Sequence, residues 1–423
     1  GTQPAQLNAN NVVFIALVIA IFSSTQDIAI DAYRVDSFLP HESDKISAAA
    51  GAATAGWWTG YAGIGALPLF LSDHGWQWPD LYVLLGLIAV GLAIANVFLP
   101  NTKISHSNAQ HDKYEGLLQQ VVSAHTHIKQ RIAFYLFVLL LSLAGILLSV
   151  FQVLPNSAFY LTAIGSIAVA AIALISYQCA QLGKSAPTGP MQSSGSSFEK
   201  SLAWTLTALI APVQEFFSRN GLKLAFALLS FIFLFKVGEA FLGRMSVVFY
   251  KEIGFSNSEI ATYAKLMTWW LTIIFSVVGA VVNARFGLVK GLFVSGIAMA
   301  STNLLFSLLA LTGPSTKIFA LAIILDGFSQ AWSTVAFVAF ISIMCNHAFS
   351  ATQYALMASL GNLGRTTLAS SSGYFVDTLH GNWALFFAIT TFMVIPSLII
   401  LWRLRPYIYK IAADAKNTRV AEN

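Results

Sequence analysis

Eleven long apolar stretches constrain the fold of this chain more than any other feature. A helix needs about 20 residues to cross a hydrocarbon core about 30 Å thick. Hydrophobic residues make up 57% of the chain and charged residues 10%, with a mean hydropathy of +0.70, so the polar surface is too small for a water-soluble globule. The sequence therefore predicts an all-α, polytopic membrane protein with eleven transmembrane helices at about 12–33, 46–71, 81–99, 132–153, 158–177, 224–250, 261–282, 292–311, 318–344, 355–376 and 383–401.

The basic residues of the loops gather on one side of these predicted spans. When alternate loops are assigned to alternate sides, one side holds only Lys251 and Lys317, and the other holds the remaining loop lysines and arginines. Loops rich in Lys and Arg stay in the cytoplasm. This pattern predicts a cytoplasmic carboxyl terminus and an external first residue. It also explains the net charge of +5 without a nucleic-acid partner.

Two polar interruptions divide the predicted spans. The first, 101–131, contains an amphipathic stretch at 114–128, and the second is a Ser/Gly/Pro-rich linker at 181–200 that leads into another amphipathic stretch at 202–217. Helices of this kind usually lie in the membrane interface. Five spans precede the second interruption and six follow it. Since the chain begins without an initiator Met or a signal peptide, we expect its start to lie in mid-protein.

The sequence lacks the motifs of several kinds of cofactor site. Cys179 and Cys345 form no CxxC or Cys/His spacing, and the eight histidines lack metal-ligand spacing. No GxxxxGK[ST] loop is present to bind a nucleotide. We therefore expect no metal and no cofactor, and a transporter of this kind would draw its energy from an ion gradient.

The first predicted span carries several ionisable groups, which are costly in a membrane and are candidates for function. Asp27, beside Gln26, and Asp31 stand at i and i+4 on one helix face, and Arg34 follows Asp31 at i+3, where the two can pair. A carboxylate here could hold and release a coupling proton. Alternatively, Asp31, Arg34 and Asp36 form a structural ion-pair cluster at the cytoplasmic end of the helix. Both interpretations stay open.

The sixth predicted span places Lys236 and Glu239 at i and i+3. At about 1.5 Å per residue, Lys236 lies ~18 Å into the membrane, near the midplane where transporters bind substrate. The alternative is a buried ion pair that only fixes helix packing.

Lys265, Asp326 and Arg365 are further charges inside predicted spans, and Asn362 lies one helical turn before Arg365. Arginine binds carboxylates in a two-pronged geometry and stays charged, so Arg365 suits the acidic end of a peptide or sugar acid. The competing interpretation pairs Arg365 with a carboxylate on a neighbouring helix.

The cytoplasmic loop at 279–290 has small residues for a tight turn. It also carries Asn283 and two basic residues, Arg285 and Lys290, whose charged groups can cap helix carboxyl ends as part of a gate.

Three runs of sequence, at 23–32, 235–241 and 345–356, together resemble the AmpG muropeptide permeases of Gram-negative bacteria, which are major-facilitator transporters. The loop at 279–290 is similar to the general major-facilitator signature, with Asn283 where Asp is usual. The resemblance implies import of anhydro-muropeptides from periplasm to cytoplasm with protons, across the inner membrane, in cell-wall recycling. The residues that it matches to family positions are Gln26, Asp27, Asp31, Lys236, Glu239, Lys265, Gln353 and Arg365.

The resemblance also implies a domain organisation. Residues 1–100 would be the remainder of an amino-terminal half (fold helices four to six, with the first three absent), 101–221 loops with an inserted helix pair, and 222–423 a six-helix half with a cytoplasmic tail. Such a chain is not expected to form an intact substrate cavity alone. The expected partners are membrane lipid and a sugar-peptide substrate, and the expected state is a monomer.

Two other functions compete with this interpretation. A related carrier could move another large anionic solute, such as an acyl-coenzyme A. From a different class, an integral membrane enzyme could act on lipid-linked sugars, but such enzymes usually cluster acidic or His residues at the membrane surface. Here the buried charges lie on separate helices, which favours a carrier over an enzyme.

Overall fold

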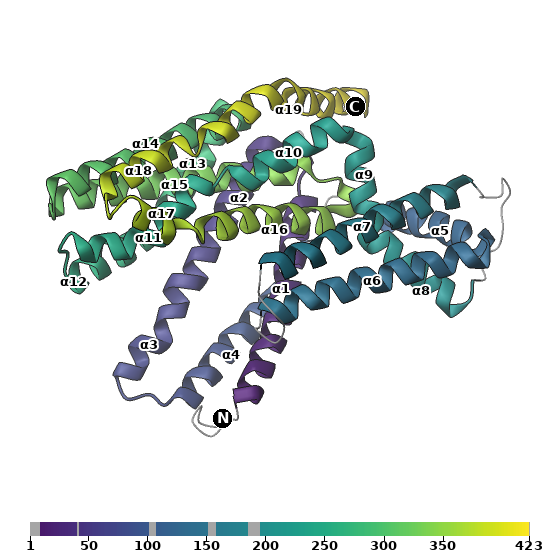
Figure 1. The fold of residues 1–423 in the computed structure, drawn as a ribbon, viewed down its shortest axis with the longest axis horizontal. Helices are drawn as coiled ribbons and strands as arrows, with labels where there is room; N and C mark the ends of the chain where they lie inside the picture. Colours follow the sequence, from purple (N-terminus) through teal and green to yellow (C-terminus); the bar gives the residue numbers. More distant parts are fainter. Residues whose placement is uncertain (1–8, 40–41, 101–106, 151–157, 185–194, 423) are drawn as a thin grey trace. The chain divides into compact units, whose positions relative to one another are not determined.

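The computed structural model describes residues 9–39, 42–100, 107–150, 158–184 and 195–422, and every regular element in these ranges is a helix (Figure 1). Nine segments in the same ranges are long and apolar enough to cross a membrane, and they overlap nine of the eleven predicted spans. The prediction of an all-α, multi-pass membrane protein is therefore confirmed. The first residue, Lys103 and the linker residues 185–194 lie outside the described ranges.

The other two predicted spans are helical but more polar. The stretch at 46–71 falls in α2 (Ser43–Trp58), the π-helical turn η2 (Thr59–Ile64) and α3 (Gly65–Asp73), and the stretch at 355–376 falls in α16 (Ser350–Ala369) and α17 (Ser372–Thr378). Both are rich in Gly, Ala, Ser and Thr, which lower their hydropathy. The count of eleven spans stays a prediction.

The chain divides into two compact units, one made of residues 1–104 with 223–423 and the other of residues 105–222. In the second unit, α6 (Thr126–Val150) and α7 (Ala158–Lys184) form a helical hairpin. Around it lie α5 (Ser107–Ser123) and a continuous helix made of α8 (Ser197–Thr205), η3 (Leu206–Ile210) and α9 (Ala211–Asn220). Leu118, Ile132, Ile175 and Leu206 belong to its own buried core, so the two amphipathic stretches supply apolar faces to this core. The assignment of the segments to parts of a major-facilitator fold stays a prediction.

The first unit begins with α1 (Ala9–Asp36), α2 to α3, and α4 (Trp78–Asn96). Helix α2 packs closely against α13 (Thr268–Phe286) because small residues line the contact. A Cβ atom added at Gly51 would lie 2.8 Å from the Ala280 Cβ and 2.9 Å from the Ser276 carbonyl oxygen. Small residues let transmembrane helices approach this closely.

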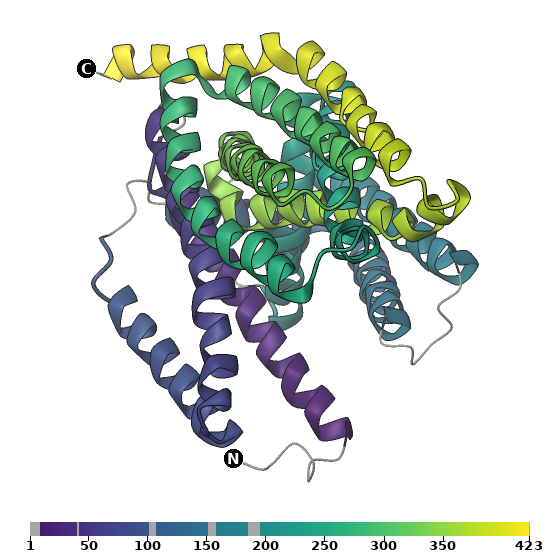
Figure 2. The same ribbon diagram turned by 90° about the vertical axis from the view of Figure 1, so that its left-hand side faces the viewer.

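The carboxyl-terminal helices of the first unit lie together as one bundle, green to yellow in Figure 2. Helix α14 (Leu288–Thr312) packs against both α15 (Thr316–Met344) and α18 (Trp383–Phe392), and α13 packs against α15. The other elements of the unit are α10 (Leu222–Leu234), α11 (Val237–Glu252), α12 (Asn257–Glu259), η4 (Ile260–Met267), η5 (His347–Phe349) and α19 (Ile395–Glu422).

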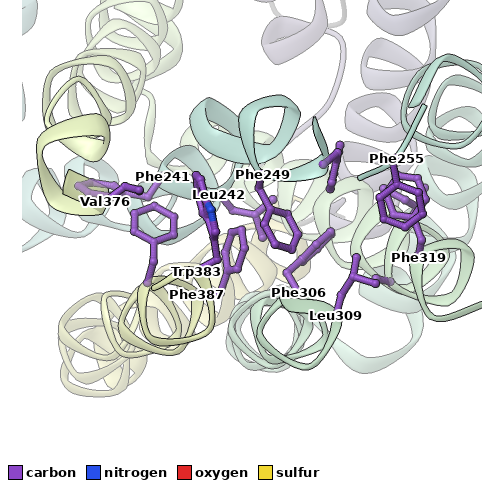
Figure 3. Packing of buried hydrophobic residues seen from close by; sticks show 14 of the residues in the cluster. Phe241, Leu242, Phe249, Phe255, Phe306, Leu309, Phe319, Val376, Trp383 and Phe387 are labelled. Carbon is purple, nitrogen blue, oxygen red and sulfur yellow. The ribbon is translucent and has the colours of Figure 1, made fainter. Parts of the chain in front are cut away.

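Aromatic side chains fill the core of this bundle (Figure 3). Phe249 of α11 lies 4.7 Å from Phe387 of α18 between ring centroids, and Tyr250 of α11 lies 4.7 Å from Phe319 of α15. Ring pairs at these distances favour offset or edge-to-face packing. The contacts hold α11 against α15 and α18, and so support the polar groups at the start of α11.

The predicted span at 224–250 is interrupted at Phe235 and Lys236, between α10 and α11. Lys236 has φ −100° and ψ 9°, outside the α-helical range, and α11 begins at the next residue. Gly238 allows the new helix to lie against α18, because an added Cβ would be 2.8 Å from the Thr390 carbonyl oxygen. This interruption was not predicted, and it directs Lys236 into the bundle.

Candidate functional site

The break between α10 and α11 places Lys236 in a buried polar network. The Lys236 ammonium donates to Glu239 Oε2 at 2.5 Å, to Ser333 Oγ at 2.7 Å and to Thr334 Oγ1 at 2.9 Å. These three acceptors match its three N–H groups. The i,i+3 pair predicted from the sequence is therefore present, and α15 supplies the other two acceptors. We call the following residues the Lys236 cluster: Lys236, Glu239, Asp326, Gln330, Ser333, Thr334 and Arg365.

Arg365 of α16 brings a second cation to Glu239. The distance from Arg365 Nη2 to Glu239 Oε1 is 3.5 Å, and the Arg365 side chain is 45% exposed while that of Glu239 is 8% exposed. The predicted pairing of Arg365 with a carboxylate of a neighbouring helix is therefore present. Since the Arg365 guanidinium is also accessible, it retains N–H donors for the carboxylate of a bound solute. Pairing with Glu239 and binding of an acidic solute are therefore compatible.

Asp326 of α15 is the second buried carboxylate of the cluster. Thr302 Oγ1 of α14 lies 3.1 Å from Asp326 Oδ1, and Gln330 Nε2 donates to Oδ2 at 3.0 Å. The Gln330 carbonyl lies 3.5 Å from the Lys236 ammonium and accepts from Ser333. Gln330 therefore links Asp326 to the environment of Lys236.

Sequence reasoning missed the neutral members of this network. Asp326, Ser329, Gln330 and Ser333 stand at i, i+3, i+4 and i+7, which places them on one face of α15. A polar stripe of this kind in an otherwise apolar helix is a signal that could have identified them.

A second polar cluster joins the end of α1 to the segment that connects α15 and α16. Arg34 pairs with Asp31 at 2.9 Å, donates to Ser342 Oγ at 2.7 Å and lies 4.8 Å from the centroid of the Tyr354 ring. The predicted pair of Asp31 and Arg34 is therefore present. We call the following residues the Arg34 cluster: Asp31, Arg34, Asp36, Ser342, His347, Ser350 and Tyr354.

Asp36 connects the Arg34 cluster to the start of α16. Ser350 Oγ donates to Asp36 Oδ2 at 3.0 Å, and His347 Nδ1 lies 3.7 Å from Asp36 Oδ1. Gln353 is buried, and its Oε1 accepts from the Asn346 backbone N–H at 2.7 Å. Two of the runs that carry the family resemblance, 23–32 and 345–356, therefore meet at or beside one cluster.

Several predicted site residues lie outside both clusters. The side chains of Gln26 and Asp27 on α1, Lys265 in η4 and Asn362 on α16 are exposed. The structure therefore brings together Asp31 with Arg34, and Lys236 with Glu239, Asp326 and Arg365. It leaves the roles of the exposed residues as predictions.

The predicted gate loop has one buried polar residue. Asn283 Oδ1 accepts from Trp332 Nε1 of α15 at 2.8 Å, and an added Cβ at Gly291 would lie 2.0 Å from that oxygen. Arg285 and Lys290 are exposed. Asn283 thus joins the end of α13 to α15, while a gating role for the two basic residues stays a prediction.

Within the described ranges, no group of three or more His, Cys, Asp or Glu side chains has the arrangement of a metal site. Neither Cys179 nor Cys345 forms a disulfide, and the Cys345 thiol donates to the Ile341 carbonyl at 3.2 Å. The polar side chains of the Lys236 and Arg34 clusters form ion pairs and hydrogen bonds with one another.

Comparison with known proteins gives partial relatives, and no family model matches the chain. It is 35% identical over 196 residues to a protein of Rickettsia conorii named as the transporter AmpG 4, covering 46% of each chain. It is 31% identical over 195 residues to the anhydromuropeptide permease of Escherichia coli, covering 46% of this chain and 39% of that one. The chain thus matches less than half the length of these curated relatives.

Among solved structures, the human organic anion transporter MFSD10 (TETRAN) shows a weak likeness, with a TM-score of 0.38 and 15% identity over 89% of this chain and 99% of that one. Both of these sequence relatives carry the names of transport proteins, a transporter and a permease. The predicted resemblance is confirmed over the matched part: this chain is an all-α, multi-pass membrane protein related in sequence to the AmpG-like permeases.

Proposed function

We propose that this protein is a secondary active transporter of major-facilitator type that imports anhydro-muropeptides from periplasm to cytoplasm by proton symport, in cell-wall recycling. It would lie in the bacterial inner membrane as a monomer, with a cytoplasmic carboxyl terminus. It would need no cofactor, because a proton gradient would supply the energy. The name of the Escherichia coli relative supports the choice of substrate.

The observation that carries this proposal is the Lys236 cluster. Buried charges in a membrane are costly and mark substrate or ion pathways. Here two cations, Lys236 and Arg365, share the carboxylate of Glu239 beside a break in a membrane helix. Broken helices provide substrate sites in secondary transporters. The accessible Arg365 guanidinium suits a carboxylate at the peptide end of a muropeptide.

The test is uptake of labelled anhydro-muropeptide, under an imposed proton gradient, by proteoliposomes that hold the chain joined to the first three helices of a major-facilitator fold. We expect accumulation that an uncoupler abolishes and that Arg365→Gln reduces at least tenfold, since loss of a charged hydrogen bond has about this effect. Arg244→Gln is the matched control, because Arg244 is an exposed arginine of α11 outside the cluster. Wild-type protein that takes up no muropeptide would refute the proposal.

A carrier of another anionic solute is the main competitor, because the two cations of the cluster would also attract a phosphate. Competition separates the two functions. We expect unlabelled anhydro-muropeptide to block uptake and an acyl-coenzyme A to leave it unchanged. The reverse result would favour the second function.

A further inference from the structure

Asp326 differs from the other carboxylate of the Lys236 cluster in its partners. Glu239 has two cations within 4 Å, Lys236 and Arg365. Asp326 is equally buried, but its hydrogen-bond partners are the neutral side chains of Thr302 and Gln330. None of the ion pairs in the described ranges includes it. A buried charge is costly without an opposite charge beside it, so Asp326 is suited to exchange a proton.

The hydrogen bonds around Thr302 can accommodate both forms of Asp326. The Thr302 hydroxyl has one proton and three partners: the Met299 carbonyl at 2.9 Å, Asp326 Oδ1 at 3.1 Å and Ser329 Oγ at 3.3 Å. The Ser329 hydroxyl is itself directed to the Asp326 carbonyl at 3.0 Å. When Asp326 is ionised, Thr302 donates to Oδ1. When Asp326 is protonated, Oδ1–H donates to Thr302, which turns its own proton to the Met299 carbonyl. Neither form leaves a hydroxyl or carboxyl hydrogen without an acceptor.

Protonation of Asp326 also changes the charge of the cluster. With Lys236, Glu239 and Arg365 charged, an ionised Asp326 makes the sum zero, and a protonated Asp326 makes it +1. The charged groups whose fields act on Asp326 are Glu239 and Lys236, and the charge of Asp326 in turn acts on the phenol of Tyr250 in α11. Because the local dielectric is low, one extra positive charge strongly favours an incoming anion. A proton and an anionic solute would therefore bind together.

We propose that Asp326 carries the coupling proton, with the Thr302 hydroxyl as the switch that stabilises both of its forms. The proton enters with the substrate, resides on Asp326 Oδ1, and leaves when the substrate anion leaves. This assignment depends on the proposed function for the identity of the substrate, but the binding of a proton to Asp326 can be tested without any substrate.

The first test is an infrared pH titration of the purified protein in lipid. We expect the carbonyl-stretch band of a buried carboxylic acid to appear as the pH falls, and to be absent in Asp326→Asn. Asp377→Asn is the matched control, because Asp377 is an exposed aspartate of α17, and it should keep the band. A band that persists in Asp326→Asn would overturn the proposal.

A second pair of variants tests the switch even if Asp326→Asn does not fold. Thr302→Val keeps the size of the side chain and removes the hydroxyl, whereas Thr302→Ser keeps the hydroxyl. We expect Thr302→Val to move the midpoint of the infrared titration by about one pH unit, and Thr302→Ser to move it much less. Equal midpoints in Thr302→Val and the wild type would exclude the role of Thr302.

Transport separates this proposal from the proposed function. In proteoliposomes that hold the chain joined to the first three helices of a major-facilitator fold, with anhydro-muropeptide on both sides, Asp326→Asn should still exchange labelled for unlabelled substrate. It should not accumulate substrate under a proton gradient. Proton-driven accumulation by Asp326→Asn would overturn the assignment. If the wild type neither exchanges nor accumulates muropeptide, the proposed function fails, and the infrared titration still decides whether Asp326 binds the proton.

Discussion

Replacement of Gly364 by alanine should both destabilise the bundle and disturb the Lys236 cluster. A Cβ at Gly364 would lie 2.1 Å from the carbonyl oxygen of Phe233 in α10, whereas ordinary contact begins at 3.4 Å. Helix α16 would therefore have to move by about 1.3 Å, because a backbone carbonyl of a neighbouring helix cannot turn aside. Overpacking of this kind costs about 1–3 kcal/mol. The same shift can carry the Arg365 guanidinium, now 3.5 Å from Glu239, beyond ion-pair distance.

Thermal unfolding in detergent, followed with a thiol-reactive dye at the buried Cys345, measures the destabilisation in a Cys179→Ala background. We expect Gly364→Ala to lower the apparent melting temperature by roughly 2–10 °C and to weaken muropeptide binding. Gly243→Ala is the matched control, since no atom lies within 4 Å of the added Cβ in α11, and it should be neutral or stabilising by up to about 1 kcal/mol. Equal stability of Gly364→Ala and Gly243→Ala would refute the close approach of α16 to α10.

Three further predictions concern charged groups. Arg34→Ala should destabilise the protein by about 1–3 kcal/mol in the same unfolding assay, because it removes buried charged hydrogen bonds. Lys45→Ala, which removes a surface ion pair with Glu42, should change the stability by less than about 1 kcal/mol. Equal losses of stability in the two variants would contradict this reasoning. In the unit of residues 105–222, the hydrogen bond from Lys129 holds the pKa of Glu199 below its ordinary value. The stability that this pair contributes is therefore present above the ordinary pKa of a glutamate, about 4.3, and is lost as the pH falls through the lowered pKa; Glu199→Gln should remove this part of the acid dependence of unfolding. Asp27→Asn should retain proton-driven uptake, because Asp27 is exposed and lies in neither cluster, and loss of uptake would transfer the proton site to α1.

The sequence predicts best the features that depend on neighbours in the chain. The all-α membrane fold follows from apolar stretches of membrane-spanning length. The ion pairs of Asp31 with Arg34 and of Lys236 with Glu239 follow from their i,i+3 spacing. The break between α10 and α11 was not predicted, because Phe235 and Lys236 are ordinary helix residues and the run contains no Pro. Tertiary packing against α15 and α18 outweighs that local preference.

What only the tertiary structure decided is which helices bring their polar groups together. Arg34 reaches Ser342, Asp36 reaches Ser350, and Asp326 meets Thr302 across sequence separations of 308, 314 and 24 residues. The sequence by itself determined that each of these groups lies at a given depth along its own helix, because the rise per residue is constant. It could not determine the rotation of one helix against another, since in lipid that rotation depends on side-chain packing and interhelical hydrogen bonds and not on the burial of apolar surface alone. The sequence therefore predicted the spacing of charges along each helix, but it did not predict which helices form the two polar clusters.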